Sequence, residues 1–137
     1  GDPDDHVRAV LTTIQNDLFD AGADLATPVV AEPEYPPLRI AQSYVDAVET
    51  WCDEFGDPLE PLTSFILPGG TVLSALLHQA RTVTRRAERR VWALARAEDV
   101  AAEVPRYLNR LSDLLFVVAR VLARHENGTE VLWRHRR

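Results

Sequence analysis

Apolar residues recur at helical spacing in four segments of the chain, and stretches rich in proline or glycine separate the first three of these segments. In the first segment Val7, Val10, Leu11, Ile14 and Leu18 fall on one helix face, and the following Gly22 is predicted to end the helix. The segment 26–38 holds four prolines and is therefore predicted to be a loop. A second helix is predicted to end near Gly56, with these residues on its apolar face: Ile40, Tyr44, Val48, Trp51, Cys52 and Phe55.

The second half of the chain predicts two longer helices, separated from the first two by a loop over 57–70. One runs from about Thr71 to Ala97, and the other from about Val104 to His125, with Asn127-Gly128 as its stop signal. A short tail from Glu130 to Trp133 is predicted to be extended. No alternation of strand and turn is present, so the fold class is predicted to be an all-α, up-and-down helical bundle.

Each of these two helices carries an apolar stripe that is predicted to face the core. On a helical wheel the stripe of the 71–97 helix fills an arc of about 80°. It is formed by Leu76, Ala80, Val83, Ala87, Val91 and Leu94. The corresponding stripe of the 104–125 helix is formed by Leu111, Leu114, Leu115, Val118, Val121 and Leu122.

A polar stripe lies opposite the apolar one on the 71–97 helix, and it consists of Arg81, Arg85, Glu88, Arg89 and Trp92. A solvated face is the simplest interpretation, but such a face usually mixes charges to gain pairs four residues apart. Here three arginines stand at that spacing and repel one another unless an anion or a carboxylate lies nearby.

The 104–125 helix lines up Asn109, Asp113, Phe116 and Arg120 away from its apolar stripe. If the two helices are antiparallel neighbours, the residues from Arg85 to Arg89 are placed to face Asn109 and Asp113. Arginines, a carboxylate and an amide together suit a triphosphate with its magnesium ion and a purine or ribose edge.

Composition narrows the class of protein further. The 137 residues suffice for one domain, predicted to span 1–137, and the net charge of −6 argues against a general nucleic-acid binder. The single cysteine, Cys52, excludes an intramolecular disulfide and is compatible with a cytoplasmic setting.

The sequence also excludes several structures and chemistries. No apolar run is long enough for a membrane span. The absence of lysine excludes Schiff-base chemistry. No Glu-x-x-His motif supports a di-iron centre, and His78 is interpreted as a surface or packing residue.

Four sequence blocks, in order and spread over most of the chain, resemble the signature blocks of the PduO-type cob(I)alamin adenosyltransferases, or corrinoid adenosyltransferases. The sharpest part of the resemblance is RRAER followed about twenty residues later by LNRLSD. The blocks are Gln15-Asn-Asp-Leu-Phe-Asp-Ala-Gly-Ala-Asp-Leu-Ala26, Phe65-Ile-Leu-Pro-Gly-Gly70, Ala80-Arg-Thr-Val-Thr-Arg-Arg-Ala-Glu-Arg89 and Tyr107-Leu-Asn-Arg-Leu-Ser-Asp-Leu-Leu-Phe116.

The resemblance implies a homotrimer of five-helix, ferritin-like bundles with active sites between neighbouring subunits. It implies an enzyme that transfers the 5′-deoxyadenosyl group of ATP to the cobalt of reduced cobalamin, with Mg²⁺, giving adenosylcobalamin and triphosphate. A cobalamin reductase and an adenosylcobalamin-dependent mutase are the partners it suggests, and neither nucleic acid nor membrane is expected.

The resemblance also implies roles for individual residues. Phe65 belongs to the cobalamin pocket, where it helps to keep the lower axial ligand off cobalt, and Arg81 forms a salt bridge between subunits. Asp113 orients the ligand and, with Arg85 and Arg89, makes up the expected catalytic set; no metal ligand is assigned. The expected ATP-binding residues are Arg85, Arg86, Glu88, Arg89 and Asn109.

The sequence departs from the family pattern at its N-terminus. Members carry a Thr-Gly-Asp-x-Gly phosphate-binding segment and a further helix ahead of the 15–26 block, and neither is present in these 137 residues. The sequence also lacks methionine, so we expect further residues upstream of Gly1. Two other function classes remain open: a non-catalytic bundle whose polar stripes only join subunits, and an RNA- or DNA-binding helix at 81–90, which the acidic remainder of the chain disfavours.

Overall fold

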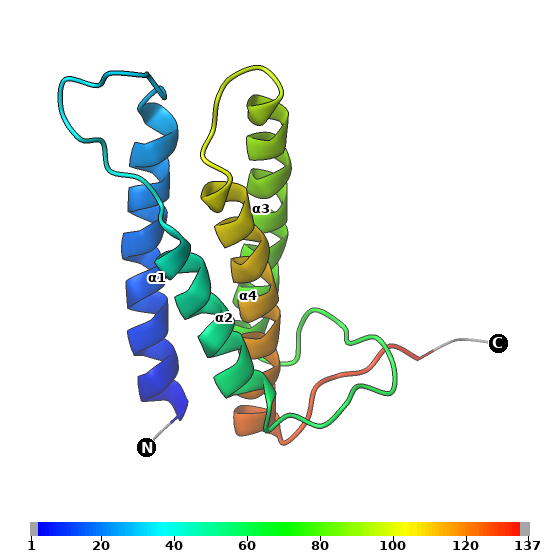
Figure 1. Cartoon of the computed structure of the whole chain (residues 1–137). Coiled ribbons are helices and arrows are strands. Elements are labelled where there is room, and N and C mark those ends of the chain that lie inside the picture. Colours follow the sequence, from blue (N-terminus) through cyan, green and yellow to red (C-terminus); the bar gives the residue numbers. More distant parts are fainter. Residues whose placement is uncertain (1–2, 135–137) are drawn as a thin grey trace.

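Four antiparallel helices form the body of the protein in the computed structural model, which describes residues 3–134 (Figure 1). They run up and down in chain order: α1 (Pro3–Ala26), α2 (Gln42–Gly56), α3 (Val72–Ala95) and α4 (Glu103–Asn127). No strand is present within the described part of the chain, which confirms the predicted all-α bundle. None of these four helices combines the length and apolar character needed to cross a membrane.

Helix α4 is the centre of the bundle and packs against each of the other three helices. Its predicted core stripe is confirmed, because the large aliphatic side chains along it are almost wholly enclosed. The helix ends as predicted, since Gly128 adopts the left-handed conformation (φ 81°) and its amide donates to the Arg124 carbonyl oxygen. The enclosed residues of this stripe are Leu111, Leu114, Leu115, Val118 and Leu122.

Helix α1 is longer than the sequence predicted. Gly22 lies inside the helix, which continues to Ala26 before the Pro-rich loop begins. Val7, Val10 and Ile14 are buried as expected, but Leu18 is exposed and the buried position next to it is taken by Asp17. The Asp17 carboxylate accepts a hydrogen bond from the Tyr107 hydroxyl at 3.0 Å. A polar contact with α4 therefore replaces the apolar one that the periodicity predicted.

The inward face of α3 is the predicted one only in part, because Val91 of the predicted stripe is buried but other members are not. Leu76 and Val83, assigned to the core stripe from the sequence, are about half exposed, whereas Ser74, His78 and Glu88 are buried against α4. The helix is rotated so that part of its polar stripe points into the bundle. This rotation brings Glu88 to the interior side of the helix, whereas Arg86 and Arg89 stay exposed.

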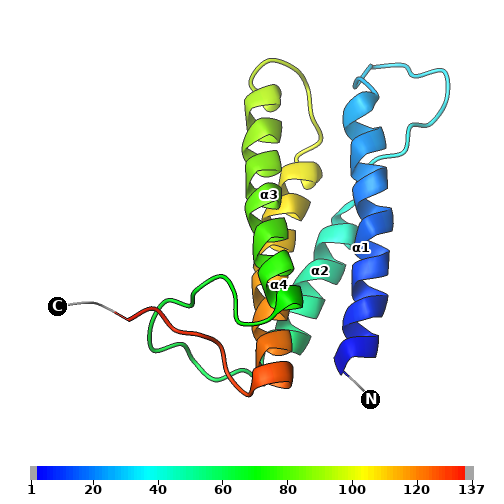
Figure 2. The same cartoon turned by 180° about the vertical axis from the view of Figure 1, so that it is seen from behind.

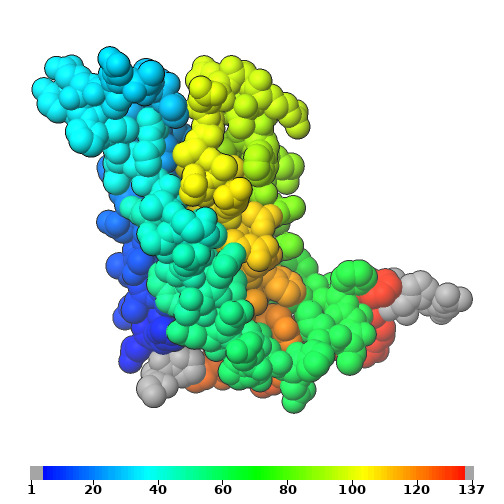
Figure 3. Space-filling model, in the orientation of Figure 1, coloured from blue at the N-terminus to red at the C-terminus, as the bar shows by residue number. Residues whose placement is uncertain are grey.

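The loop before α3 and the C-terminal tail lie together at one end of the bundle and project from it as a small lobe (Figure 3). The Thr71 side chain caps α3 by accepting from the Ser74 amide at 3.1 Å. The tail is extended, as predicted, and Ile66 and Leu132 form an isolated antiparallel bridge between the two segments. The lobe therefore contains two short, paired stretches of backbone outside the helices.

The view from behind shows that α1 and α3 do not pack closely against each other (Figure 2). Between them lies a groove of about 330 Å³, lined partly by Val7, Leu11, Leu73 and Leu122. The apolar side of α3 that includes Leu76 is exposed as well. One face of the bundle thus leaves apolar surface uncovered in the isolated chain.

Candidate active site

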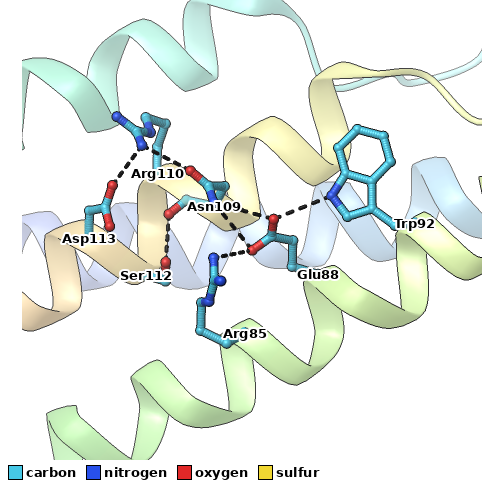
Figure 4. A network of polar contacts seen from close by, with 7 residues as sticks. All are labelled: Arg85, Glu88, Trp92, Asn109, Arg110, Ser112 and Asp113. Carbon is cyan, nitrogen blue, oxygen red and sulfur yellow. Dashed lines mark hydrogen bonds and ion pairs between the residues drawn. The ribbon is translucent and has the colours of Figure 1, made fainter.

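A buried carboxylate organises the polar side chains between α3 and α4 (Figure 4). Glu88 is 8% exposed, and its Oε1 atom pairs with Arg85 Nη1 at 2.8 Å. Its Oε2 atom accepts from Trp92 Nε1 at 3.3 Å, and Asn109 Nδ2 reaches both oxygens at 3.3 and 3.4 Å. The predicted meeting of the two helices at Glu88 and Asn109 is therefore present.

The hydrogen bonds of Glu88 hold Arg85 in a defined place without using all of its donors. Only Nη1 of the guanidinium contacts Glu88, and the Arg85 side chain is 43% exposed. The remaining nitrogens are left for water or for a bound anion. A guanidinium presents its donors as a planar fork, which matches the oxygens of a phosphate.

A second group of contacts extends along α4 from Asn109. Arg110 Nη2 donates to Asn109 Oδ1 at 2.9 Å and pairs with Asp113 Oδ2 at 2.7 Å (Figure 4). The sequence-based expectation that Arg85 and Arg89 face Asp113 is wrong in this respect, because the Asp113 carboxylate is paired on its own helix. Arg110 was not singled out from the sequence, although its spacing of three from Asp113 is typical of a helix ion pair.

Arg86 and Arg89 lie outside this network. Both are exposed, and within residues 3–134 neither forms an ion pair or hydrogen bond through its side chain. Arg120, which the wheel placed in line with Asn109, is also elsewhere: it is buried and pairs with Glu130. A single chain thus assembles Arg85, Glu88 and Asn109 but leaves the other expected cations facing away.

A hollow of about 770 Å³ opens beside the polar network, and we call it the aromatic hollow. It brings together Phe65 from the loop, which the resemblance assigned to the cobalamin pocket, and Arg81 from α3, which it assigned to a salt bridge between subunits. Its other lining residues are Leu62, Thr63, Ser64, Ile66, Phe116 and Trp133. Because Arg81 precedes Glu88 by seven residues on α3, the aromatic hollow lies roughly 10 Å along the helix from the polar network.

Charged and aromatic groups are stacked on the α3 side of the aromatic hollow. The Arg81 guanidinium lies over the Phe116 ring at 5.4 Å, and His78 meets the same ring edge-on at 6.1 Å. Burial, together with the Arg81 charge, lowers the pKa of His78, so its imidazole is neutral near pH 7. Among residues 3–134 Arg81 has no carboxylate partner.

A smaller hollow of about 430 Å³ lies on the α2 side of the polar network, and we call it the polar hollow. Glu88, Trp92, Asn109 and Arg110 line it together with α2 residues that include Gln42. The site therefore consists of two neighbouring compartments along α3, one aromatic and one polar. Such an arrangement can hold a large planar ligand next to a polyanionic one.

No resident metal centre is evident in the described residues, since no three His, Cys, Asp or Glu side chains there are grouped to hold an ion. The lone thiol also has no features of a nucleophile. Burial, with a contribution from the Asp113 charge, raises the pKa of Cys52 to about 11. The arginines and hydrogen-bond donors of this site can position ligands and stabilise their charge.

The protein is thus a helical bundle with an arginine–carboxylate network beside an aromatic hollow. The sequence profile of the cobalamin adenosyltransferase family matches residues 2–122. The chain is 59% identical over 136 residues to the corrinoid adenosyltransferase of Mycobacterium tuberculosis, covering 98% of this chain and 69% of that protein. It is 41% identical to the human corrinoid adenosyltransferase MMAB, covering 90% of this chain and 50% of the human one.

A solved structure agrees with these sequence comparisons. A variant of the PduO-type ATP:corrinoid adenosyltransferase of Lactobacillus reuteri, complexed with cobalamin and ATP, superposes with a TM-score of 0.87 at 37% identity. The match covers 98% of this chain and 72% of that structure. The chain belongs to the cobalamin adenosyltransferase family, as its sequence blocks predicted.

Proposed function

We propose that this protein is an ATP:corrinoid adenosyltransferase. It transfers the 5′-deoxyadenosyl group of ATP to the cobalt of reduced cobalamin, and it releases adenosylcobalamin and triphosphate. The family membership, together with an L. reuteri relative complexed with both ATP and cobalamin, supports this activity. The observation that carries it within this chain is the adjacency of two compartments, the Arg85–Glu88–Asn109 network and the aromatic hollow.

The polar compartment is proposed to bind ATP. Arg85, held by Glu88, offers its free guanidinium nitrogens to the triphosphate, and Asn109 offers an amide to the nucleoside. Arg86 and Arg89 are proposed to complete this site once a neighbouring subunit or the ligand itself supplies an anion. Asp113 is proposed to orient the ligand indirectly, through Arg110 and Asn109.

The aromatic hollow is proposed to receive the corrin ring of cobalamin. Reduced cobalt is itself a strong nucleophile, so the protein need only align the ribose 5′ carbon with cobalt and stabilise the leaving triphosphate. Phe65, 78% exposed at the rim, is proposed to occupy the place of the lower axial ligand. A four-coordinate cobalt(II) is easier to reduce than a five-coordinate one, so this displacement favours the nucleophilic state.

Magnesium is proposed to enter with ATP rather than to occupy a site made by the protein alone. Mg²⁺ commonly binds through substrate phosphates and one or two carboxylates while it keeps several waters. When bound, the ion would supply neutralisation of triphosphate charge, and Glu88 is the buried carboxylate that lies against Arg85.

Assembly with a further helix and with other subunits would cover the exposed apolar surfaces of the bundle. We propose a single domain spanning 1–137 that takes part in a five-helix bundle, with the fifth helix covering the groove between α1 and α3. We also propose a homotrimer, in which Arg81 finds its carboxylate partner across the subunit boundary. The exposed Phe19 on α1, 79% accessible, gives a further apolar contact for a neighbour.

Two further assignments accompany the activity. The lone free thiol of Cys52 is compatible with a cytoplasmic setting, where a reductase would supply reduced cobalamin and a mutase would use the product.

The activity is tested by mixing the protein with ATP and chemically reduced cobalamin and measuring the adenosylcobalamin and triphosphate that form. Calorimetric titration with ATP and cobalamin separates the enzyme from a bundle that only joins subunits, because the latter binds neither ligand.

A further inference from the structure

The C-terminal tail is attached to the bundle by a buried carboxylate. Glu130 is 6% exposed, and its Oε1 atom accepts from Arg120 Nε at 2.7 Å and from Arg124 Nε at 2.8 Å. Burial opposes its ionisation, but the hydrogen bonds from these two arginines outweigh it and lower the pKa of Glu130 to about 2. We call this three-residue cluster the C-terminal clamp.

The C-terminal clamp also holds the start of the loop that leads to Phe65. Arg120 Nη2 donates to the Glu60 carbonyl oxygen at 2.6 Å. Arg124 Nη1 lies 3.9 Å from the Glu60 carboxylate. One pair of arginines on α4 is thus shared between the loop before α3 and the tail after α4, two segments far apart in the sequence.

Beyond Glu130 the tail runs antiparallel to the residues on both sides of Phe65. Leu67 N donates to the Val131 carbonyl oxygen at 2.7 Å, and Trp133 N donates to the Phe65 carbonyl oxygen at 2.6 Å. The Phe65 and Trp133 rings meet edge to face at 6.1 Å. The backbone on both sides of the Phe65 ring is therefore paired with the tail.

Phe65 has little other support within the described chain. Its side chain is among the most exposed apolar groups, so packing into the core does not set its position. Hydrogen bonds to charged groups are stronger than neutral ones, and removing one partner of a buried ion pair leaves the other charge uncompensated. Loss of Glu130 would consequently release the tail and, with it, the pairing that orients Phe65.

We propose that the C-terminal clamp of Glu130, Arg120 and Arg124 is a positioning device that sets the Phe65 ring at the rim of the aromatic hollow. The clamp residues line neither the aromatic hollow nor the polar hollow, and they act through the tail backbone. This inference rests on the proposed function, because it assigns the clamp to the cobalamin side of the reaction. It predicts a selective effect on cobalamin handling, with ATP binding left unchanged.

The test compares Glu130→Gln with the milder Arg124→Gln, which removes a partly exposed arginine and leaves the Glu130–Arg120 pair in place. The matched control is Asp24→Asn, since Asp24 is also buried and accepts from Arg39 Nη1 and Ile40 N, each at 2.7 Å. Asp24 is in the last turn of α1, and this end of α1 lies at the opposite end of the bundle from the tail (Figure 1). Steady-state kinetics, cob(II)alamin electron paramagnetic resonance with ATP present, and amide hydrogen exchange are measured for the wild type and all three variants.

We expect Glu130→Gln to raise the KM for cobalamin by about tenfold and to change the KM for ATP by less than about twofold. The four-coordinate fraction of bound cob(II)alamin should fall, and the Leu67 and Trp133 amides should exchange faster, with Arg124→Gln showing smaller changes in the same direction. Asp24→Asn should keep the wild-type four-coordinate fraction even if it unfolds at a lower temperature.

Two outcomes overturn the inference. In the first, a folded Glu130→Gln or Arg124→Gln protein keeps both the wild-type KM for cobalamin and the wild-type four-coordinate fraction of cob(II)alamin. In the second, the KM for cobalamin and the KM for ATP rise equally. Failure of the proposed function gives a different result, since the wild-type protein would then form no adenosylcobalamin. In that case faster exchange at Leu67 and Trp133 would still test whether the C-terminal clamp holds the Phe65 loop.

Discussion

Arg85 has the most specific arrangement of any arginine on α3. Its neighbour Glu88 is buried and receives donors from three side chains, so the guanidinium is held at the polar compartment before any ligand arrives. Preorganised donors of this kind stabilise charge that develops in a transition state without further rearrangement. Arg90, on the same helix, is exposed and has no such partner in the described chain.

We expect Arg85→Ala to lower kcat/KM for ATP by about a hundredfold or more, because a donor aimed at the leaving triphosphate is lost. Arg90→Ala removes the same kind of side chain from the same helix and should stay within about twofold of wild type. Steady-state adenosylation assays with both variants measure the difference. Near-wild-type turnover in Arg85→Ala would remove this arginine from the site.

The thiol of Cys52 should react slowly with alkylating reagents because it is partly buried. Its pKa is raised to about 11, chiefly by burial, from an ordinary value of 9.0. At pH 8 the thiolate fraction is then about a hundredfold lower than for an ordinary cysteine, and alkylation should be slower to a similar degree. Mass spectrometry measures the rate at which iodoacetamide alkylates Cys52 in the native and in the urea-unfolded protein. Equal rates in the two states would contradict the raised pKa.

Helix ends and helix interiors place opposite demands on glycine. Gly128 has φ 81° and no neighbouring atom within 4 Å of the place a Cβ would take, so Gly128→Ala should destabilise through backbone strain alone, by about 1 kcal/mol. Gly22 lies inside α1 with open space around it, so Gly22→Ala should stabilise by about 0.5–1 kcal/mol. Urea unfolding of both variants checks the two signs, and equal signs would contradict this account.

The pairing between tail and loop should depend on pH through Glu130. Against the effect of burial, Arg124 and Arg120 lower the pKa of this carboxyl to about 2, and Glu60 is the other charged group near them. A lowered folded-state pKa gives stability that is fully present above the unfolded value of 4.5 and is lost as the pH falls towards 2. Amide chemical shifts of Leu67 and Trp133 should change over that range, whereas a transition centred above pH 5 would implicate another group.

The elements of this fold were predictable from sequence to unequal degrees. Helix α4 was predicted well because its large aliphatic residues occupy one stripe that faces the core. Helix α3 was predicted only in part, because it has an apolar stripe and a polar one, and hydropathy alone selects the apolar stripe for the interior. Its inner face carries Val91 of the apolar stripe but also Glu88 and His78, which are buried with hydrogen-bond or ring partners.

The parts of the site that could not be predicted depend on contacts that periodicity does not specify. Arg85, Glu88 and Asn109 lie on two regular helices, and their meeting followed from helical geometry. The pairing of Glu130 with Arg120 depends on how an irregular tail folds back onto α4. The ion pair of Asp113 was not predicted, and its partner Arg110 lies on the same helix.

At the scale of the whole molecule, exposed apolar surface is the feature that still needs partners. Phe19 and the apolar side of α3 are accessible in the isolated chain, and such surface commonly marks an interface. We expect the protein to sediment as a trimer of the 15.4 kDa chain, and Phe19→Ser to shift it towards smaller species. Asn16→Ser, on an exposed position of the same helix, should leave the mass unchanged, and a monomeric wild type would contradict the trimer.

The proposed reaction of this protein is the transfer of an adenosyl group from ATP to cobalt. It is tested by the absorbance change when ATP and chemically reduced cobalamin are incubated with the 137-residue chain. A second protein, which also carries the upstream segment expected for the family, is measured in parallel. We predict adenosylcobalamin, with one triphosphate released per molecule formed, in at least the longer protein. Absence of adenosylcobalamin from both proteins, when both are folded and cobalamin stays reduced, would contradict the account.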